Sequence, residues 1–237
     1  MWSGPRNIST ALMRSFENRD DTAVLDEPFY AYYLKKTGFH HPGRELVLKS
    51  QSSSWTEVVS YCLSEIPLKK TIWYQKHMAH HSFENNNMDW IVGFNNCLLI
   101  RDPKAVIKSF KKKFSINSSL QLGYFQQLKI YDIIVKHTGE PPIIIDSMDL
   151  LKNPKIIIKK LCKSLGILFS PKMLTWPKGR RESDGVWAKY WYENVENSTG
   201  FKKYEKKNLT LNIDEKIIYN ECLPIYNKLL FQLRIKL

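Results

Sequence analysis

The stretch LLIRDPKAVIKS, residues 98–109, decides the fold class of this chain. It begins as an apolar strand that ends at Arg101, turns at Asp102, and continues as a helix with Pro103 in its first turn, where proline is favoured. Ser109 lies two turns into that helix. Ligands of α/β proteins bind at the carboxyl ends of strands, so Arg101 and Ser109 can converge on one phosphate group. The alternative is an ion pair for Arg101 and a solvated Ser109.

Strands and helices alternate along the rest of the chain. Short β-branched runs predict strands at 22–25, 71–75, 97–100 and 142–146, and apolar periodicity predicts helices at 55–63, 103–114, 120–136, 154–165 and 214–235. This alternation predicts an α/β fold with a mainly parallel central sheet. Residues 170–209 are rich in loops, and no linker is visible, so we expect a single domain over residues 1–237.

Composition narrows the class of partner. Lys and Arg number 36 against 23 Asp and Glu, a formal net charge of +13. Such an excess indicates an anionic partner, either nucleic acid, an anionic membrane or a phosphorylated small molecule, although a lysine-rich composition alone explains it equally well. The basic residues are scattered without a DNA- or RNA-binding motif, which argues against nucleic acid. No apolar run is long enough for a membrane-spanning helix. Four well-separated cysteines and the lack of a signal peptide favour the cytoplasm.

A second candidate anion site begins the chain, in SGPRNISTALMRSF, residues 3–16. A Gly-Pro turn and a Ser9-Thr10 pair precede a helical pattern, and free N–H groups at a helix start bind anions. Arg6 adds positive charge. Ser9 and Thr10 stand where a Walker A loop requires Gly and Lys, which argues against an ATPase or kinase. The alternative is a surface helix capped by Ser9 or Thr10.

Together these two segments resemble the sulfotransferase family that uses 3′-phosphoadenosine 5′-phosphosulfate (PAPS), and most of all a bacterial subgroup with Trp-Ser-Gly-Pro-Arg-Asn and Asp-Glu-Pro. The family's 5′-phosphosulfate loop reads Pro-Lys/Arg-Ser-Gly-Ser/Thr-Thr. Its 3′-phosphate motif reads Arg-Asn/Asp-Pro, with Ser eight residues after the Arg. The resemblance implies a P-loop NTPase-like three-layer sandwich that binds PAPS as co-substrate without a metal. The donor-binding residues that it implies are Arg6, Asn7, Ser9, Thr10, Arg101, Ser109, Gly179 and Arg180.

Sulfuryl transfer also needs a base and a group that stabilises the developing charge. Glu27, just past the strand at 22–25, is the first candidate for the base, and capping the next helix is its alternative role. The resemblance implies that Lys76, at the end of the strand at 71–75, contacts the transferring group. His77 is the alternative base. With His80 and His81 it also has the spacing of a metal site on a helix face, but no Glu or Cys completes a ligand set nearby, and ordinary structural histidines explain the cluster as well.

Two features depart from the family pattern. Ile8 stands where the family usually has Gly, so the loop is not expected to wrap a phosphate in the same way. Only Met1 and Trp2 precede Ser3, so the central first strand is expected to be truncated. Both features keep a second interpretation open, an inactive nucleotide- or phosphate-binding module. The acceptor, which we expect to be a small molecule, and the oligomeric state are not specified by any motif. Three roles are open for the aromatic side chains of Trp187, Trp191 and Tyr192: ordinary packing, stacking on the adenine, or covering the acceptor pocket.

Overall fold

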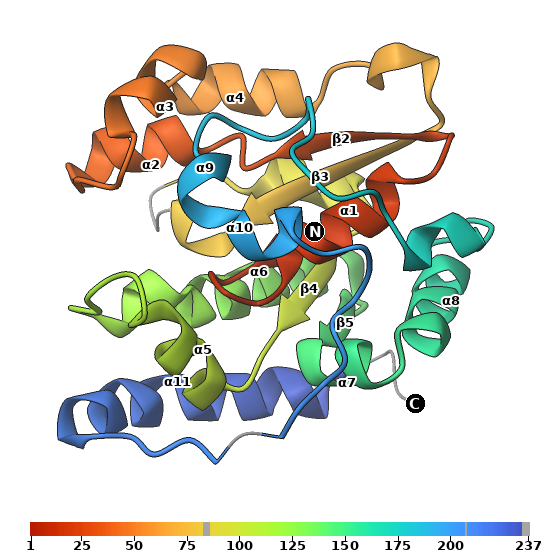
Figure 1. Ribbon diagram of the computed structural model, residues 1–237. Helices are drawn as coiled ribbons and strands as arrows, with labels where there is room; N and C mark the ends of the chain where they lie inside the picture. Colours follow the sequence, from red (N-terminus) through yellow and green to blue (C-terminus); the bar gives the residue numbers. More distant parts are fainter. Residues whose placement is uncertain (83–85, 207, 234–237) are drawn as a thin grey trace.

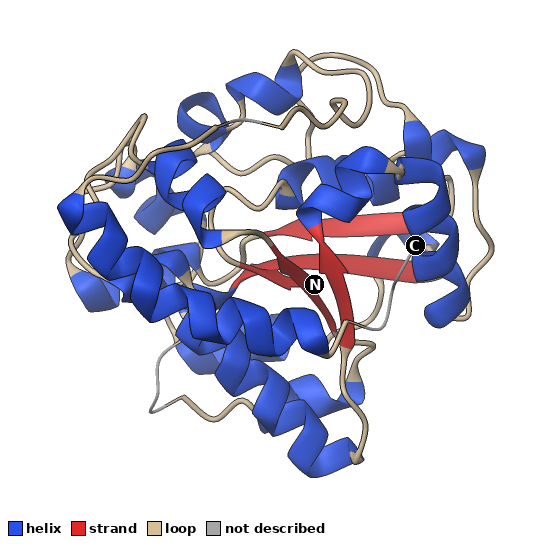
Figure 2. Ribbon diagram, turned by 90° about the horizontal axis from the view of Figure 1, so that it is seen from below, coloured by secondary structure: helices blue, strands red, loops and turns tan. Residues whose placement is uncertain are grey.

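A computed structural model of the chain describes residues 1–82, 86–206 and 208–233. Its centre is a five-stranded, fully parallel sheet of order β2-β3-β1-β4-β5 (Figures 1 and 2). The strands are β1 (Trp2–Ser3), β2 (Thr22–Asp26), β3 (Ile72–Met78), β4 (Cys97–Ile100) and β5 (Ile143–Asp146). The α/β class and the four strands predicted from β-branched runs are therefore confirmed.

Helices cover both faces of the sheet and complete three layers. The larger ones are α1 (Ser9–Glu17), α2 (Tyr30–Thr37), α4 (Trp55–Cys62), α5 (Pro103–Phe110), α6 (Tyr124–Thr138), α8 (Pro154–Ser164) and α11 (Ile213–Phe231). The shorter ones are α3 (Arg44–Ser50), α7 (Ser147–Lys152), α9 (Ala188–Trp191) and α10 (Glu193–Glu196). In the described part of the chain, no helix combines the length and apolarity that a membrane crossing requires.

The core follows from the two-residue period of the strands, which sends neighbouring side chains to opposite faces. Leu98 and Ile100 of β4 pack with α5, α6 and α11 on one face. Leu99 points the other way and packs with α1 and α8. Near-continuous apolar strands such as β4 are typical of parallel sheets buried on both faces.

Several predicted boundaries were wrong for identifiable reasons. The helix expected at 103–114 ends at Phe110, and Phe114 instead stacks on Trp191 with ring centroids 4.3 Å apart. The helix expected at 120–136 begins at Tyr124, because Gly123 at φ 79° separates it from a 3₁₀ turn. The last helix begins at Ile213 and ends at Phe231, and positions 234–235 of the predicted range lie outside the described residues. Helices α3, α7, α9 and α10 were not predicted, and the last two lie in the segment expected to be rich in loops.

The central strand β1 is as short as expected, with two residues between β3 and β4. Trp2 pairs with His77 and Leu98, whereas β3 already begins at Ile72. Below β1, a cavity of about 310 Å³ is bounded by Met1, residues 71–75 of the β3 side and Cys97 of β4. We call this space the β1 slot. It lies where further residues of a longer β1 would pair with β3 and β4.

The amino group of Met1 faces the β1 slot and donates a hydrogen bond of 2.8 Å to the Gln75 carbonyl. Burial lowers its pKa from 8.0 to about 6. The charged amine is therefore less stable in the folded chain than in the unfolded chain, and this cost is fully present below pH 6 and gone above pH 8. For a protein made to begin at this Met1 with a free amine, we expect the free energy of unfolding to rise by up to about 2 kcal/mol between these pH values, measured by urea denaturation. A chain acetylated at Met1 should lose this rise, and an unchanged pH dependence would contradict the assignment.

Candidate functional site

A cavity of about 1090 Å³ opens at the carboxyl ends of all five strands. Its lining includes side chains that follow β1, β2, β3, β4 and β5 in turn: Arg6, Glu27, His80, Arg101 and Ser147. Helices α1, α2, α5, α7, α9, α10 and α11 and the segment 197–205 also contribute to the wall. This is the edge where ligands of open α/β sheets bind.

The loop between β1 and α1 is held from three sides. Gly4 is required there, because a Cβ atom would stand 2.3 Å from the Leu122 carbonyl oxygen. The Asn7 side chain donates to the Leu99 carbonyl at 3.0 Å, and its own carbonyl accepts from Ser147 Oγ at 3.0 Å. The Arg101 guanidinium donates to the Arg6 carbonyl at 2.5 Å. The loop is therefore preorganised by neighbouring strand ends.

Ile8 has the backbone conformation of the glycine that usually stands at its place in the family pattern. Its backbone adopts φ 61° and ψ 21°, the left-handed conformation that a glycine would favour, despite its branched side chain. A left-handed β-branched residue costs about 1–2 kcal/mol, which the anchored loop imposes. No side chain caps α1, so the expected capping by Ser9 or Thr10 is not found. The first turn of α1, whose N–H groups have no acceptor within the helix, lines the cavity instead.

Arg101 and Ser109 both line the cavity, as their spacing predicts, and Arg6 lies beside them. Arg6 Nε donates to Ser109 Oγ at 3.1 Å, and both guanidiniums line the cavity. Neither guanidinium forms an ion pair with any described residue. Burial lowers the pKa of both, and the charge of Arg101 lowers that of Arg6 further. Two half-buried cations without a carboxylate partner form a site for an anion.

Three other expected donor ligands lie away from the cavity. The Asn7 side chain is buried beneath the loop that it anchors. The Gly179 N–H donates to the Glu196 carbonyl at 2.8 Å, and Arg180 is exposed to solvent. None of these three residues is among those lining the cavity. The lining does include Ser147, Lys202 and Lys203, which sequence reasoning missed. Two signals were available in the sequence: the position of Ser147 directly after β5, and the basic pair Lys202-Lys203 within the loop-rich segment 170–209.

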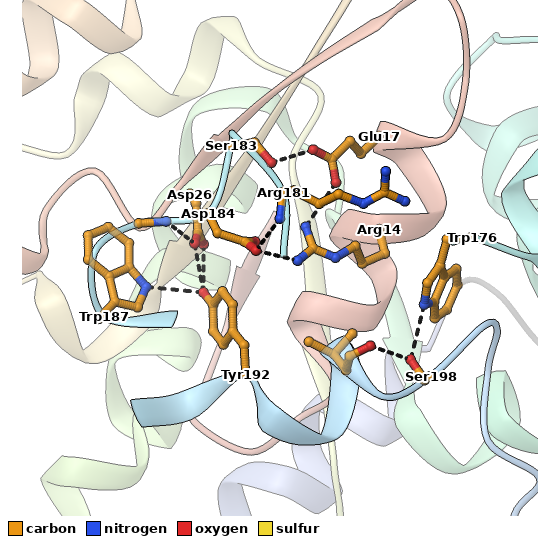
Figure 3. A network of polar contacts seen from close by, with 12 residues as sticks. Arg14, Glu17, Asp26, Trp176, Arg181, Ser183, Asp184, Trp187, Tyr192 and Ser198 are labelled. Carbon is orange, nitrogen blue, oxygen red and sulfur yellow. Dashed lines mark hydrogen bonds and ion pairs between the residues drawn. The ribbon is translucent and has the colours of Figure 1, made fainter. Parts of the chain in front are cut away.

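The end of β2 carries a buried ionic cluster. Lys76 Nζ lies 2.7 Å from Asp26 Oδ1 and 2.7 Å from Glu27 Oε1. The Tyr192 hydroxyl donates to Asp26 at 2.7 Å and accepts from Lys76 at 2.5 Å (Figure 3 shows the Asp26 contact). Lys76 is fully buried and does not line the cavity, whereas Glu27 does. Of this cluster, Glu27 and Tyr192 reach the cavity.

The charge balance of this cluster explains its titration. Two carboxylates and one ammonium leave one net negative charge. Burial and the neighbouring Asp26 raise the pKa of Glu27, although Lys76 opposes them. The two carboxylates raise the pKa of Lys76 and so outweigh its burial. Glu27 also adopts φ 42°, a strained conformation, and its carboxylate accepts from Lys76 and does not cap α2. A strained, cavity-facing carboxylate with a raised pKa is a candidate general base.

His77 does not reach the cavity. Because β3 extends to Met78 through pairing with β1, His77 lies within the strand. There it stacks on Trp2, with ring centroids 4.3 Å apart, and burial holds its pKa well below the usual range. His80 and His81 follow in a 3₁₀ turn and do line the cavity. The three rings therefore do not share a helix face, and the described residues contain no group of three or more potential metal ligands.

A second polar network holds the chain segment that covers the ends of β2 and β3 (Figure 3). Buried Arg14 of α1 pairs with Asp184 at 2.6 Å, and Asp184 also accepts from the Arg181 N–H at 2.8 Å. Further along, Trp187 Nε1 donates to the Tyr192 hydroxyl at 3.2 Å. Trp187 is thus buried behind the cavity, whereas Trp191 and Tyr192 line it.

Comparisons with known proteins agree with this arrangement. A sequence model described as a sulfotransferase domain matches residues 1–232. Two solved structures resemble the fold: the sulfotransferase domain of the Synechococcus PCC 7002 olefin synthase, and a sulfotransferase domain from the curacin biosynthetic pathway. The match to the first has a TM-score of 0.55 and 16% sequence identity, and it covers 93% of this chain and 92% of the olefin synthase domain. The match to the second has a TM-score of 0.50 and 15% sequence identity, and it covers 93% of this chain and 95% of the curacin-pathway domain.

Two curated relatives from Arabidopsis thaliana, branched-chain-amino-acid aminotransferase-like proteins 2 and 1, are 35% and 36% identical over 226 residues. These residues are 95% of this chain, which spans 40% of the relatives' length. The family model matches nearly the whole chain, and the fold is a parallel α/β sheet with a cationic cavity at the carboxyl ends of its strands. The chain therefore belongs to the sulfotransferase domain family.

Proposed function

We propose that this protein transfers a sulfuryl group from PAPS to a hydroxyl or amine of a small-molecule acceptor, without a metal ion. The observation that carries the proposal is the pair of half-buried guanidiniums of Arg6, which donates to Ser109 Oγ, and Arg101, which donates to the Arg6 carbonyl; neither has a carboxylate partner in the described chain. The first turn of α1 adds N–H groups beside them. Together these groups offer two neighbouring sites for the two phosphate-bearing ends of the donor.

Each donor contact has a proposed role. The α1 turn with Ser9 and Thr10 binds the 5′-phosphosulfate, and Arg6 neutralises charge there as the bridging oxygen leaves. Arg101 and Ser109 bind the 3′-phosphate. Lys202 and Lys203 line the same cavity and add positive charge. Asn7 acts indirectly, because its side chain anchors the loop to Leu99.

We propose Glu27 as the general base and revise the role of Lys76. All three N–H donors of Lys76 have partners in Asp26, Glu27 and Tyr192, so we assign it to positioning Glu27. His77 is left with a packing role. The four cysteines are buried free thiols, which supports a reducing compartment such as the cytoplasm.

The test is a thermal-shift titration with adenosine 3′,5′-bisphosphate, beside ATP with and without Mg²⁺. A ligand at about 100 times its Kd stabilises by roughly 2.7 kcal/mol, so selective and magnesium-independent stabilisation is expected. ATP binding that depends on Mg²⁺, or no stabilisation of a folded sample, would contradict the proposal. Bisphosphate binding without sulfuryl transfer to any acceptor would instead favour an inactive nucleotide-binding module.

A further inference from the structure

The adjacent carboxylates of Asp26 and Glu27 have unequal surroundings. Glu27 lines the cavity, accepts from Lys76 at 2.7 Å, and has only a long contact of 3.3 Å with the Tyr192 hydroxyl. Asp26 is buried and is not among the residues that line the cavity. Its two oxygens accept from Lys76 at 2.7 Å, from the Tyr192 hydroxyl at 2.7 Å and from the Gly185 N–H at 3.4 Å. The carboxylate that is hidden from the cavity therefore has the larger share of the donors.

The Tyr192 hydroxyl decides this division. It accepts from Lys76 at 2.5 Å and from Trp187 Nε1 at 3.2 Å, and it has a single proton to donate. The nearer Asp26 oxygen lies 2.7 Å away and the Glu27 oxygen 3.3 Å away, so the donated bond goes to Asp26. Tyr192 and Lys76 thus hold Asp26 from two sides. The negative charge that Lys76 does not neutralise is left on Glu27, at the cavity.

The segment that carries Tyr192 is itself held in place (Figure 3). Asp184 pairs with buried Arg14 of α1 at 2.6 Å. Gly185 is required beside it, because a Cβ atom there would stand 2.2 Å from the Trp187 ring. Tyr192 joins α9 to α10 and is 4% exposed. Its hydroxyl is therefore fixed by contacts with α1, with the end of β2 and within its own segment.

The groups that face Glu27 explain how the hydroxyl affects its titration. Burial, the largest cause, and Asp26 raise the pKa of Glu27, whereas Lys76 and the Tyr192 hydroxyl lower it. Tyr30 faces Glu27 from α2, and burial raises its pKa, so it stays uncharged. His81, in the turn after β3, stacks on Tyr30, and burial holds its pKa well below the usual range. Removal of the Tyr192 hydroxyl should therefore raise the pKa of Glu27 further.

We infer that Tyr192 is a positioning residue for the general base: its hydroxyl holds Asp26 against Lys76 and so leaves Glu27 as the carboxylate that takes the acceptor's proton. The inference rests on the proposed function, in which Glu27 is the base. In that step the acceptor oxygen or nitrogen bonds to sulfur and its proton goes to Glu27. The bond between sulfur and the bridging oxygen breaks, and its electron pair leaves with adenosine 3′,5′-bisphosphate.

The experiment is a pH titration of the Glu27 carboxyl group, followed by carbon NMR of isotope-labelled glutamate and assigned with Glu27→Gln. It needs neither donor nor acceptor. Tyr192→Phe keeps the ring, removes the hydroxyl, and should raise the pKa of Glu27 by about one pH unit. Trp187→Phe removes the Nε1 donor to the same hydroxyl and should give a smaller shift in the same direction. A Glu27 signal that titrates as in the wild type in both variants would overturn the inference.

Tyr226→Phe is the matched control. The Tyr226 hydroxyl also donates to a buried carboxylate, Asp146, at 2.9 Å, but Asp146 ends β5, at the opposite edge of the sheet from β2. This variant should lower the melting temperature about as much as Tyr192→Phe and leave the titration of Glu27 unchanged. An equal Glu27 shift in both tyrosine variants would indicate general loosening of the fold, and the positioning role would be wrong.

Binding of adenosine 3′,5′-bisphosphate, measured by calorimetry, separates this inference from the proposed function. Tyr192→Phe should bind it within about twofold of the wild type, because the hydroxyl contacts the carboxylate cluster and not Arg6 or Arg101. A loss of tenfold or more would place Tyr192 in the donor site instead of behind the base. Failure of the wild type to bind the bisphosphate would contradict the proposed function, while the Glu27 titration would still decide whether Tyr192 controls this carboxylate.

Discussion

Replacement of Arg101 by methionine should weaken binding of adenosine 3′,5′-bisphosphate by about 100-fold. The guanidinium is half-buried, lies beside Arg6 and faces the cavity. A charge-assisted hydrogen bond contributes about 1.5–3 kcal/mol, and every 1.4 kcal/mol is a factor of ten in affinity. Isothermal titration calorimetry measures the effect. Because methionine fills most of the volume of arginine, the loss of bisphosphate affinity measures the missing guanidinium charge more than any change in packing.

The control for Arg101 is Arg180→Met, because Arg180 is exposed and does not line the cavity. It should bind the bisphosphate as the wild type does. The apo melting temperature of the Arg101 variant should change little, since removal of one of two neighbouring cations offsets the lost bond to the Arg6 carbonyl. Equal bisphosphate affinity in the wild type and the Arg101 variant would refute the assignment of this residue.

The second large effect is on stability. Lys76→Met should lower the free energy of unfolding by about 3–5 kcal/mol at pH 7, because Asp26 and Glu27 then lie buried without their cation. Lys113→Met is the control: its ammonium is 3.5 Å from Glu193 and partly exposed, and its loss should cost less than about 1 kcal/mol.

The pH dependence separates this explanation from lost packing. In the Lys76 variant, the already raised pKa of Glu27 rises further above its unfolded value. The penalty is then largest above the folded pKa and shrinks as the pH falls and the carboxyl is protonated. The difference in unfolding free energy between variant and wild type should therefore be smaller near pH 5 than at pH 8. A difference that does not vary with pH would assign the loss to packing.

The parts of the site that were predicted correctly are those fixed by local sequence. Arg101 and Ser109 converge because a strand, a proline turn and a helix follow within twelve residues, and these elements have standard dimensions. Glu27 reaches the cavity because it directly follows β2. The order of strands and helices gave the α/β class for the same reason, since hydrophobic period is a local property.

The positions that differ from the expectation depend on distant partners. Lys76 lies inside the ionic cluster and does not line the cavity, and Tyr192, 116 residues away, takes one of its hydrogen bonds. His77 lies within β3 and not beyond its end, because pairing with β1 extends β3 to Met78, and the His77 ring packs on Trp2. Ile8 adopts a glycine-like conformation because Leu99 and Ser147 hold Asn7. Neither periodicity nor residue preference reports such contacts.

The position of β1 has a consequence for how the protein folds during synthesis. The first residues of the chain form the central strand, and Trp2 meets Leu98 of β4, which is made 96 residues later. At a synthesis rate of about 5–20 residues per second, Trp2 is made several seconds before β4, the second strand that pairs with β1. Closing a loop of this length lowers the conformational entropy of the chain before the contacts that stabilise the sheet have formed. Closure of the sheet around β1 is thus expected to be a late event, and until then β3 and β4 expose edges that can pair with other chains.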